Sequence, residues 1–488
     1  FRWTAYVERL EAAGVSWRIY QDMADNFTDN PLAGFKAFRD SYAKLPGSDP
    51  VWAQKALSTR LLDGLREDVL AGTLPQVSYV IAPAKDSEHP GPSSPAQGAD
   101  FTAQVISALT ADPKVWAKTV LLLMYDENDG FFDHVPPPAP PSRDPANPNA
   151  LLGASTVDTS SEYHLVRNPT EAKYERDHLM GRPYGLGPRV PMFIISPWSR
   201  GGWVNSQVFD HTSVIRFLEE RFGVMEPNIS PWRRAVCGDL TTAFNFKSPN
   251  AAAFASNLPE TGTDAAKAKA LLAWALPKTP ASPSAPVQAA GLRPSRALPY
   301  ALEVTDSVKD GALHLSFNNI GKSGAVFHVY DRLRLDLPPR RYTVEAGKSL
   351  ADQWPQGAHD LWVLGPNGFH RHYVGNASDS EPTVSTRAEA KGPVLTVTVN
   401  NPGAAPLSLA ITANEYGLKP ATLTVPAGGT AKAQWTLRSS AGWYDLSVTD
   451  PKASGYHRRL AGRIETGKDS FSDPAMEGPA LMDQLKLV

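Results

Sequence analysis

The sequence contains a single cysteine, Cys237, so no disulfide can form within the chain. This count is typical of a reducing compartment, or of a protein that is exported already folded. No run of about 18 apolar residues is present, so no transmembrane helix is expected. The charges nearly balance, with 48 Lys+Arg against 50 Asp+Glu. That balance argues against nucleic acid as a partner and against bulk attraction to anionic membranes.

The sequence also lacks an initiator methionine and any basic stretch followed by an apolar one, so no targeting segment is evident. It opens at Phe1 directly into helical material, and we expect the chain to start inside a longer gene product. Its 488 residues suffice for several domains. Apolar residues make up 42% and charged residues 20%, which excludes a mainly disordered or fibrous chain.

The first half of the chain alternates helix and strand signals. Asp49 and Ser94 are each followed by a proline, a pair that predicts a helix start. Residues 77–81, 119–125 and 190–195 are predicted strands, and the last two lack the polar alternation of a half-exposed strand. The pattern predicts an α/β domain with a mainly parallel sheet and flanking helices.

Two segments depart from this alternation. The proline-rich and polar stretch from Tyr125 to Arg189 is predicted to run over the edge of the sheet as a lid or a disordered segment. Residues 278–295 are rich in Pro, Ala and Ser and are predicted to form an extended linker. The α/β domain would therefore span residues 1–277.

Beyond this linker the sequence repeats itself. Residues 315–319 (LSFNN) match residues 397–401 (VTVNN), 82 positions later, and Phe369-His370-Arg371 matches Tyr456-His457-Arg458, 87 positions later. Two more matches in the same order make a duplication the best interpretation. We predict two small all-β sandwich domains and a tail, at residues 296–380, 381–470 and 471–488.

The densest polar cluster directly follows the predicted strand 119–125. Asp126 and Glu127 leave that strand together, and in open α/β sheets ligands bind at the carboxyl ends of strands. Paired carboxylates supply the hard oxygen ligands that divalent cations prefer. The alternative is an acidic turn in contact with solvent.

Three histidines, His89, His134 and His211, each come shortly after one of the three predicted strands. A single such histidine is ordinarily a surface or capping residue. Three of them would converge on one rim of the sheet, which favours a shared site. There they would bind metal, hold a phosphoryl oxygen, or act as a general acid.

These motifs together resemble the bacterial phospholipase C family, part of the phosphoesterases that include the bacterial acid phosphatases, within the alkaline-phosphatase-like superfamily. The resemblance covers nearly the whole chain, and the two C-terminal repeats resemble the tandem domain that ends those phospholipases. It is carried by the motifs YDENDGFFDHVPPP at 125–138, SEHP at 87–90, RVP at 189–191, ISPWS at 195–199 and FDHTS at 209–213.

The resemblance implies an alkaline-phosphatase-like fold and a metal-assisted phospho-enzyme mechanism. In the family a Thr or Ser nucleophile and a Glu-Asn metal pair precede the segment with which this chain begins, so the chain looks like the C-terminal portion of such an enzyme. It implies an N-terminal fragment of the same precursor as a partner. Asp126 and Glu127 match the family's second pair of metal ligands, and His89, His134 and His211 match positions near the phosphate.

The implied function is hydrolysis of phosphatidylcholine, with sphingomyelin as a further candidate, to diacylglycerol or ceramide and phosphocholine. A phosphomonoesterase of the acid phosphatase type is the alternative, and a non-catalytic protein that binds lipid or glycan is the alternative of another class. The expected partners are phospholipid substrate and, transiently, the membrane surface. The expected location is outside the bacterial cell, after export in folded form by the twin-arginine route.

An aromatic cage for the choline cation is a further interpretation that the sequence raises. Trp17, Trp198 and Trp203 are the candidates. Packing in the core or at the rim of a domain is the simpler interpretation for each of them.

Overall fold

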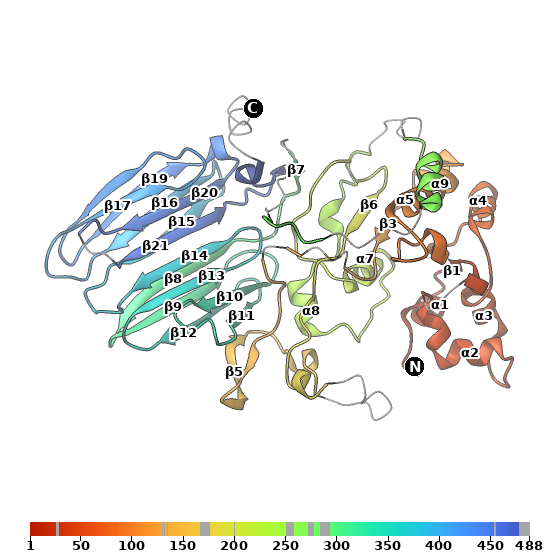
Figure 1. Cartoon of the computed structure of the whole chain (residues 1–488), viewed down its shortest axis with the longest axis horizontal. Coiled ribbons are helices and arrows are strands. Elements are labelled where there is room, and N and C mark those ends of the chain that lie inside the picture. Colours follow the sequence, from red (N-terminus) through yellow and green to blue (C-terminus); the bar gives the residue numbers. More distant parts are fainter. Residues whose placement is uncertain are drawn as a thin grey trace.

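The computed structural model describes an α/β region and a long β region that lie next to each other (Figure 1). Among the residues described, no helix combines the length and the apolar character needed to cross a bilayer. The described residues are 1–25, 29–128, 130, 132–133, 135–165, 176–199, 201–249, 258–271, 278–283, 293–452 and 455–477.

The helices of the α/β region start and stop where the sequence provides caps. The Asp49 carboxylate accepts the Val51 N–H at 2.9 Å at the start of α3 (Pro50–Ala56). Helix α4 (Leu62–Ala71) ends at Gly72, whose φ of +68° is left-handed and suits glycine. The other helices of this region are α1 (Tyr6–Ala12), α2 (Lys36–Tyr42), α5 (Pro95–Leu109), α6 (Pro113–Trp116), α7 (Thr212–Phe222), α8 (Pro231–Val236) and α9 (Gly262–Ala270).

The strands of this region form two separate pairs. Strand β1 (Trp17–Tyr20) pairs in parallel with β2 (Val77–Val80), whereas β3 (Leu121–Met124) pairs antiparallel with β6 (Met192–Ile195). The mixed α/β class is thus confirmed, but the described residues do not form the single, mainly parallel sheet that we predicted. An apolar run encodes burial and not strand direction, so the sequence pattern could not reveal the antiparallel pair.

The β3–β6 pair is also less covered than its apolar sequence predicted. Met124 is 44% exposed and Phe193 is 54% exposed, although both lie in the expected strands. Apolar side chains of a central strand are normally buried on both faces. This pair therefore presents apolar surface that the described residues leave uncovered.

The three tryptophans considered for a choline cage have structural contacts instead. Trp17 is only 2% exposed and belongs to the core between α1, α2 and β1. The Trp198 indole N–H donates to the Ala117 carbonyl oxygen at 3.0 Å. Trp203 lies beneath the Arg296 guanidinium, 5.5 Å from its ring centre. The packing interpretation describes Trp17 best.

The β region consists of two repeats in which strands follow in the same order and pair in the same way. In each, one sheet of three strands (β12-β9-β8 and β19-β16-β15) faces a larger sheet (Figure 1). The first repeat contains β8 (Leu302–Lys309), β9 (Ala312–Asn319), β10 (Ala325–Asp331), β11 (Arg340–Val344), β12 (Ser349–Trp354), β13 (His359–Leu364) and β14 (His370–Gly375). The second contains β15 (Thr383–Glu389), β16 (Val394–Asn400), β17 (Leu407–Ala413), β18 (Ala421–Val425), β19 (Thr430–Thr436), β20 (Trp443–Thr449) and β21 (His457–Arg463).

The repeated asparagine of the sequence has the same role in both repeats. The Asn319 side-chain amide donates to the Val344 carbonyl at 2.8 Å, and the Asn401 amide donates to the Val425 carbonyl at 3.3 Å. Each asparagine also accepts the backbone N–H two residues ahead at 3.0 Å. A buried polar side chain must have its hydrogen bonds satisfied, so this residue type is kept at the strand end in both copies.

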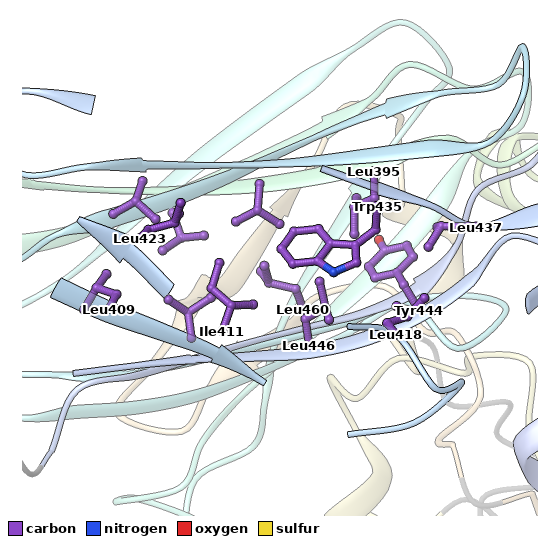
Figure 2. Close-up of a cluster of buried hydrophobic side chains, with 14 of the residues drawn as sticks. Leu395, Leu409, Ile411, Leu418, Leu423, Trp435, Leu437, Tyr444, Leu446 and Leu460 are labelled. Atoms are coloured by element: carbon purple, nitrogen blue, oxygen red, sulfur yellow. The ribbon is translucent and has the colours of Figure 1, made fainter. Parts of the chain in front are cut away.

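Each repeat encloses its own hydrophobic core. In the second repeat, Trp435 and Tyr444 belong to a cluster that also includes Leu409, Ile411 and Leu446 (Figure 2). A separate cluster fills the first repeat around Phe317 and Tyr342. Two cores explain why the sequence reads as two repeats.

The two repeats are joined by a shared sheet. Strands β14 and β21 pair antiparallel and join the larger sheets of both repeats into a ten-stranded sheet. At its other end, β11 pairs in parallel with β5 (Asn147–Ser155), which in turn pairs with β4 (Ser142–Asp144). The segment that we expected to be a lid or disordered therefore supplies two edge strands of the β region.

The predicted linker and tail are described only in part. Within the linker, residues 284–292 lie outside the described residues, and β7 (Pro294–Ser295) pairs with β22 (Ser470–Phe471). Of the tail, residues 478–488 lie outside the described residues. The start of the first repeat is thus held against the end of the second.

Candidate functional site

Tyr125, the residue after β3, connects three of the motifs found in the sequence. Its carbonyl oxygen accepts a hydrogen bond from Nε2 of His211 at 2.9 Å. Its hydroxyl donates to Oε1 of Glu88 at 3.0 Å. The segments around 88–89, 125–127 and 211 therefore meet at the end of β3.

His211 is held in place by the residue before it. The Asp210 carboxylate accepts Nη1 of Arg233 at 2.7 Å and the Thr212 hydroxyl at 2.6 Å. Arg233, on α8, also pairs with the buried Glu162 at 3.1 Å. These bonds fix the backbone at the start of α7, where His211 stands. Because Nε2 donates to a carbonyl, Nδ1 is the unprotonated nitrogen of the neutral ring.

Glu88 stands in a tight turn after β2. Its φ of +69° is left-handed, and its N–H donates to the Ser93 hydroxyl at 3.0 Å. Its side chain packs on Gly98 of α5, where an added Cβ would lie 2.2 Å from Glu88 Cγ. Glycine at this position therefore lets the carboxylate reach Tyr125. Burial, together with the hydrogen bond to Glu88, raises the pKa of Tyr125 to about 12.

The two proposed metal ligands directly follow Tyr125. Asp126 and Glu127 are both exposed at the surface. Their carboxylates are the hard donors that a divalent cation requires. Within the described ranges, however, no three His, Cys, Asp or Glu side chains converge as a metal site would need. Asp126 and Glu127 could supply two oxygen ligands to a cation, and the described residues place no further ligand beside them.

Of the other two predicted histidines, the structure describes His89 but not His134. His89 is exposed in the turn next to Glu88, and its N–H donates to the Ser87 hydroxyl at 3.2 Å. His134 lies outside the described residues. The residue before it, Asp133, pairs with Arg189 at 3.2 Å, which joins this loop to the segment that leads into β6.

The meeting point of the three motifs lies at an open surface. Phe132 and Val135 follow Asp126 and Glu127 closely in the sequence, and their side chains are 67% and 46% exposed. Two cavities of about 380 and 390 Å³ lie elsewhere, one next to Cys237 and the other next to Trp3. Neither is lined by any of the four predicted site residues that the structure describes.

Sequence reasoning did not single out four residues whose contacts position the side chains of the candidate site. Glu88 and Tyr125 contact each other across the chain, and Asp210 with Arg233 positions His211. Glu88 and Asp210 each stand directly before a predicted histidine, and that adjacency was the available signal. The contacts of Tyr125 and Arg233 depend on tertiary structure and leave no local pattern.

Two protein-family models match this chain. The model of the phosphoesterase family matches residues 1–225. The model of the bacterial phospholipase C C-terminal domain matches twice, over residues 294–376 and 382–463. The two matches of the second model coincide with the two repeats of the β region.

Individual relatives agree with these matches. A non-hemolytic phospholipase C of Pseudomonas aeruginosa is 51% identical over 98% of this chain and 68% of its own length. A non-hemolytic phospholipase C of Burkholderia pseudomallei is 42% identical over 97% of this chain and 70% of its own length. Phospholipase C A of Mycobacterium tuberculosis is 38% identical over 51% of this chain and 44% of its own length.

The chain therefore belongs to the bacterial phospholipase C branch of the phosphoesterase family. The predicted family and the predicted enzyme class, a phosphoric diester hydrolase, are confirmed by these matches.

Proposed function

We propose that this protein is a phospholipase C that cleaves phosphatidylcholine into diacylglycerol and phosphocholine, with sphingomyelin as a second substrate. The observation that carries the proposal is the hydrogen bond from His211 to the Tyr125 carbonyl. This hydrogen bond joins two motifs of the phospholipase C type that lie 86 residues apart in the sequence. It is made by the residue that directly precedes the Asp126–Glu127 pair.

In this proposal Asp126 and Glu127 bind a divalent cation. A bound cation would neutralise charge on the phosphoryl oxygens. His211 stands beside them with Nε2 committed to Tyr125, which leaves Nδ1 to accept a proton or to face the phosphate. His89 lies in the turn that Glu88 ties to Tyr125, and we assign it and His134 to the surroundings of the phosphate.

We further propose that an upstream segment of the same precursor supplies the nucleophile and the remaining metal ligands. Two observations support this partner. The relatives named above are longer than this chain, which covers 68% and 70% of the first two. The exposed apolar residues Met124 and Phe193 offer the β3–β6 pair as a surface for further strands. Such strands would complete an alkaline-phosphatase-like sheet.

The proposed place of action is outside the cell, after export in folded form by the twin-arginine route. A protein that is exported already folded does not depend on disulfides formed outside the cell. The one cysteine of this chain, Cys237, is free and buried, which is consistent with that route. The phospholipid is then met at a membrane surface.

The test uses the enzyme produced together with its upstream segment and the substitutions Asp126→Asn and Glu127→Gln. We expect each to reduce bound metal and the hydrolysis of p-nitrophenyl-phosphorylcholine together, because loss of a charged oxygen ligand leaves the cation under-coordinated. Bound metal is measured by elemental analysis of the purified enzyme. Glu67→Gln, on the exposed side of α4, is the matched control.

Normal metal content and normal turnover in both variants would contradict the metal assignment. Faster hydrolysis of p-nitrophenyl phosphate than of the phosphorylcholine ester would favour a phosphomonoesterase. Binding of lipid without either activity would favour the non-catalytic alternative.

A further inference from the structure

The loop between β10 and β11 carries three leucines on its surface. Leu333 is 55% exposed, Leu335 is 67% exposed and Leu337 is 45% exposed. Single exposed leucines are common on soluble proteins and need no explanation. Three of them at alternate positions of one short loop form a concentrated apolar tip.

This loop, Arg332–Pro339, is held in a fixed shape by its own backbone. The Asp331 side chain accepts the Leu333 N–H at 3.0 Å, and the Asp331 carbonyl accepts the Arg334 N–H at 2.9 Å. The Arg334 carbonyl accepts the Leu337 N–H at 3.1 Å, so a second turn follows the first. The leucines are therefore held outward by two successive turns and are not free to collapse onto the sheet.

A tryptophan extends the same surface. Trp362 of β13 is 39% exposed and pairs across the sheet with Tyr330 of β10, just before the loop. The Arg332 guanidinium lies over its ring, 4.5 Å from the ring centre. Tryptophan is enriched where a protein meets the boundary between lipid and water, because its body is apolar and its N–H is polar.

The cations around the leucines are each matched by a carboxylate. Arg332 pairs with Asp360 at 3.2 Å, and Arg334 pairs with Asp336 at 3.1 Å. Arg340, where β11 begins, pairs with Asp352 at 2.8 Å. An anionic membrane would attract unpaired cations. A surface of paired charges around an apolar tip instead complements a zwitterionic lipid surface, whose phosphates and choline groups also alternate in sign.

We propose that the Leu333–Leu335–Leu337 tip and Trp362 insert into the head-group region of phosphatidylcholine bilayers and hold the enzyme at its substrate. This proposal rests on the proposed phospholipase function. The apolar side chains enter the lipid, and the paired charges stay in the hydrated head-group layer. Binding then comes from apolar burial and not from net charge.

The insertion is tested with an environment-sensitive fluorophore attached at Leu335→Cys in the full chain. The native Cys237 does not compete for the label, because it is 2% exposed and burial raises the pKa of its thiol. The probe vesicles consist of phosphatidylcholine. We expect a blue shift on mixing, and quenching by brominated lipid. The label at Leu70→Cys on α4, where Leu70 is 57% exposed, should show neither.

The energetic contribution is tested with the double substitution Leu333→Ser and Leu335→Ser. We expect vesicle partitioning to fall by about tenfold for each leucine, the effect of losing apolar burial. Leu61→Ser with Leu70→Ser is the matched control, because these leucines of the α4 region are 50% and 57% exposed. Raising the salt from about 0.1 to about 1 M should leave partitioning by the native chain unchanged.

Equal partitioning by the double variant and the native chain would overturn the proposal, as would binding that requires anionic lipid or disappears in salt. A dimer that the same substitutions dissociate, without vesicle binding, would assign the tip to a second copy of the chain and overturn the proposal as well. Hydrolysis of the soluble ester is measured in parallel on the enzyme produced together with its upstream segment. Its absence, combined with normal vesicle partitioning, would count against the proposed function and not against the docking loop.

Discussion

At the residue scale, the position of His211 in the candidate site is defined by hydrogen bonds on either side of it. Its Nε2 donates to the Tyr125 carbonyl, and its backbone is held by the Asp210–Arg233 ion pair of 2.7 Å. Such fixed placement is what a proton-transfer group requires, because its reacting nitrogen must face one direction.

We therefore predict that His211→Ala lowers kcat by about 10²- to 10⁴-fold in the enzyme that includes its upstream segment, the usual contribution of a general acid or base. Steady-state hydrolysis of p-nitrophenyl-phosphorylcholine measures the effect, and circular dichroism checks the fold. Arg233→Lys tests positioning through Asp210 and should reduce kcat less than His211→Ala does. Native turnover of His211→Ala would remove this histidine from the chemistry.

Two buried arginines occupy equivalent positions in the two repeats, and each bonds to the opposite repeat. Arg458 of β21 pairs with Asp306 of β8 at 2.8 Å and with Glu381 at 2.6 Å. Arg371 of β14 donates to the Tyr444 hydroxyl at 3.0 Å. Both side chains are almost completely buried. The repeated His-Arg motif of the sequence is thus part of the contact between repeats.

Arg458→Met should destabilise the protein by about 3–5 kcal/mol, because it leaves two buried carboxylates without their cation. Urea unfolding of the full chain measures the loss. Arg334→Met is the control: its pair with Asp336 is exposed to solvent and should contribute little to stability. Equal effects of the two substitutions would show that burial does not distinguish these ion pairs.

At the element scale, the larger sheet of the first repeat buries histidines in their neutral form. Burial lowers the pKa of His328 on β10 and of His370 on β14 to about 3, and that of His359 on β13 to about 4. The imidazole Nδ1 of His328 has no hydrogen-bond partner among the residues described. Protonation of these rings is therefore unfavourable in the folded sheet.

This burial predicts a loss of stability in mild acid. Unfolded histidines titrate near pH 6.5, so below that pH the unfolded chain binds more protons than the folded one. Stability is complete above about pH 6.5 and declines toward about pH 4, by about 1.4 kcal/mol for each of these histidines at about pH 5.5. Urea unfolding of the full chain from about pH 7.5 to about pH 5 measures the slope. His328→Phe should reduce it, and an unchanged slope would contradict neutral burial.

The sequence was a good guide to where these elements lie and a poor guide to how they pair. The apolar runs at 77–81, 119–125 and 190–195 contain β2, β3 and β6, because burial selects apolar residues. Pairing is set by contacts between distant segments, so the antiparallel direction of β6 and the docking of β5 on β11 left no local signal. The motif histidines stay predictions, and no local pattern pointed to the bond that the structure shows between His211 and Tyr125.

At the scale of the whole molecule, the α/β region and the β region are joined by much more than the linker. Trp232 of α8 is fully buried, and its indole N–H donates to the Thr343 hydroxyl of β11 at 3.0 Å. Val326 of β10 packs in the same cluster as Trp232. The Gly324 N–H donates to the Ala235 carbonyl at 2.9 Å. Among the described residues, the linker is therefore not the sole connection between the two regions.

Truncation after Pro283 should therefore not leave a stable α/β domain. It would remove β11, the partner of β5. It would also remove Thr343 and Val326 from around Trp232, which leaves part of this large apolar side chain exposed and its indole N–H without its partner. We expect residues 1–283 to bind hydrophobic dyes, to be digested rapidly by protease and to lack a cooperative calorimetric transition. A chain that ends at Glu477 keeps every contact named above and should melt like the full chain. A cooperative transition of residues 1–283 at the temperature of the full chain would contradict this prediction. It would show that the linker separates two independent folding units, and that the hydrogen bond from Trp232 to Thr343 forms only after both have folded.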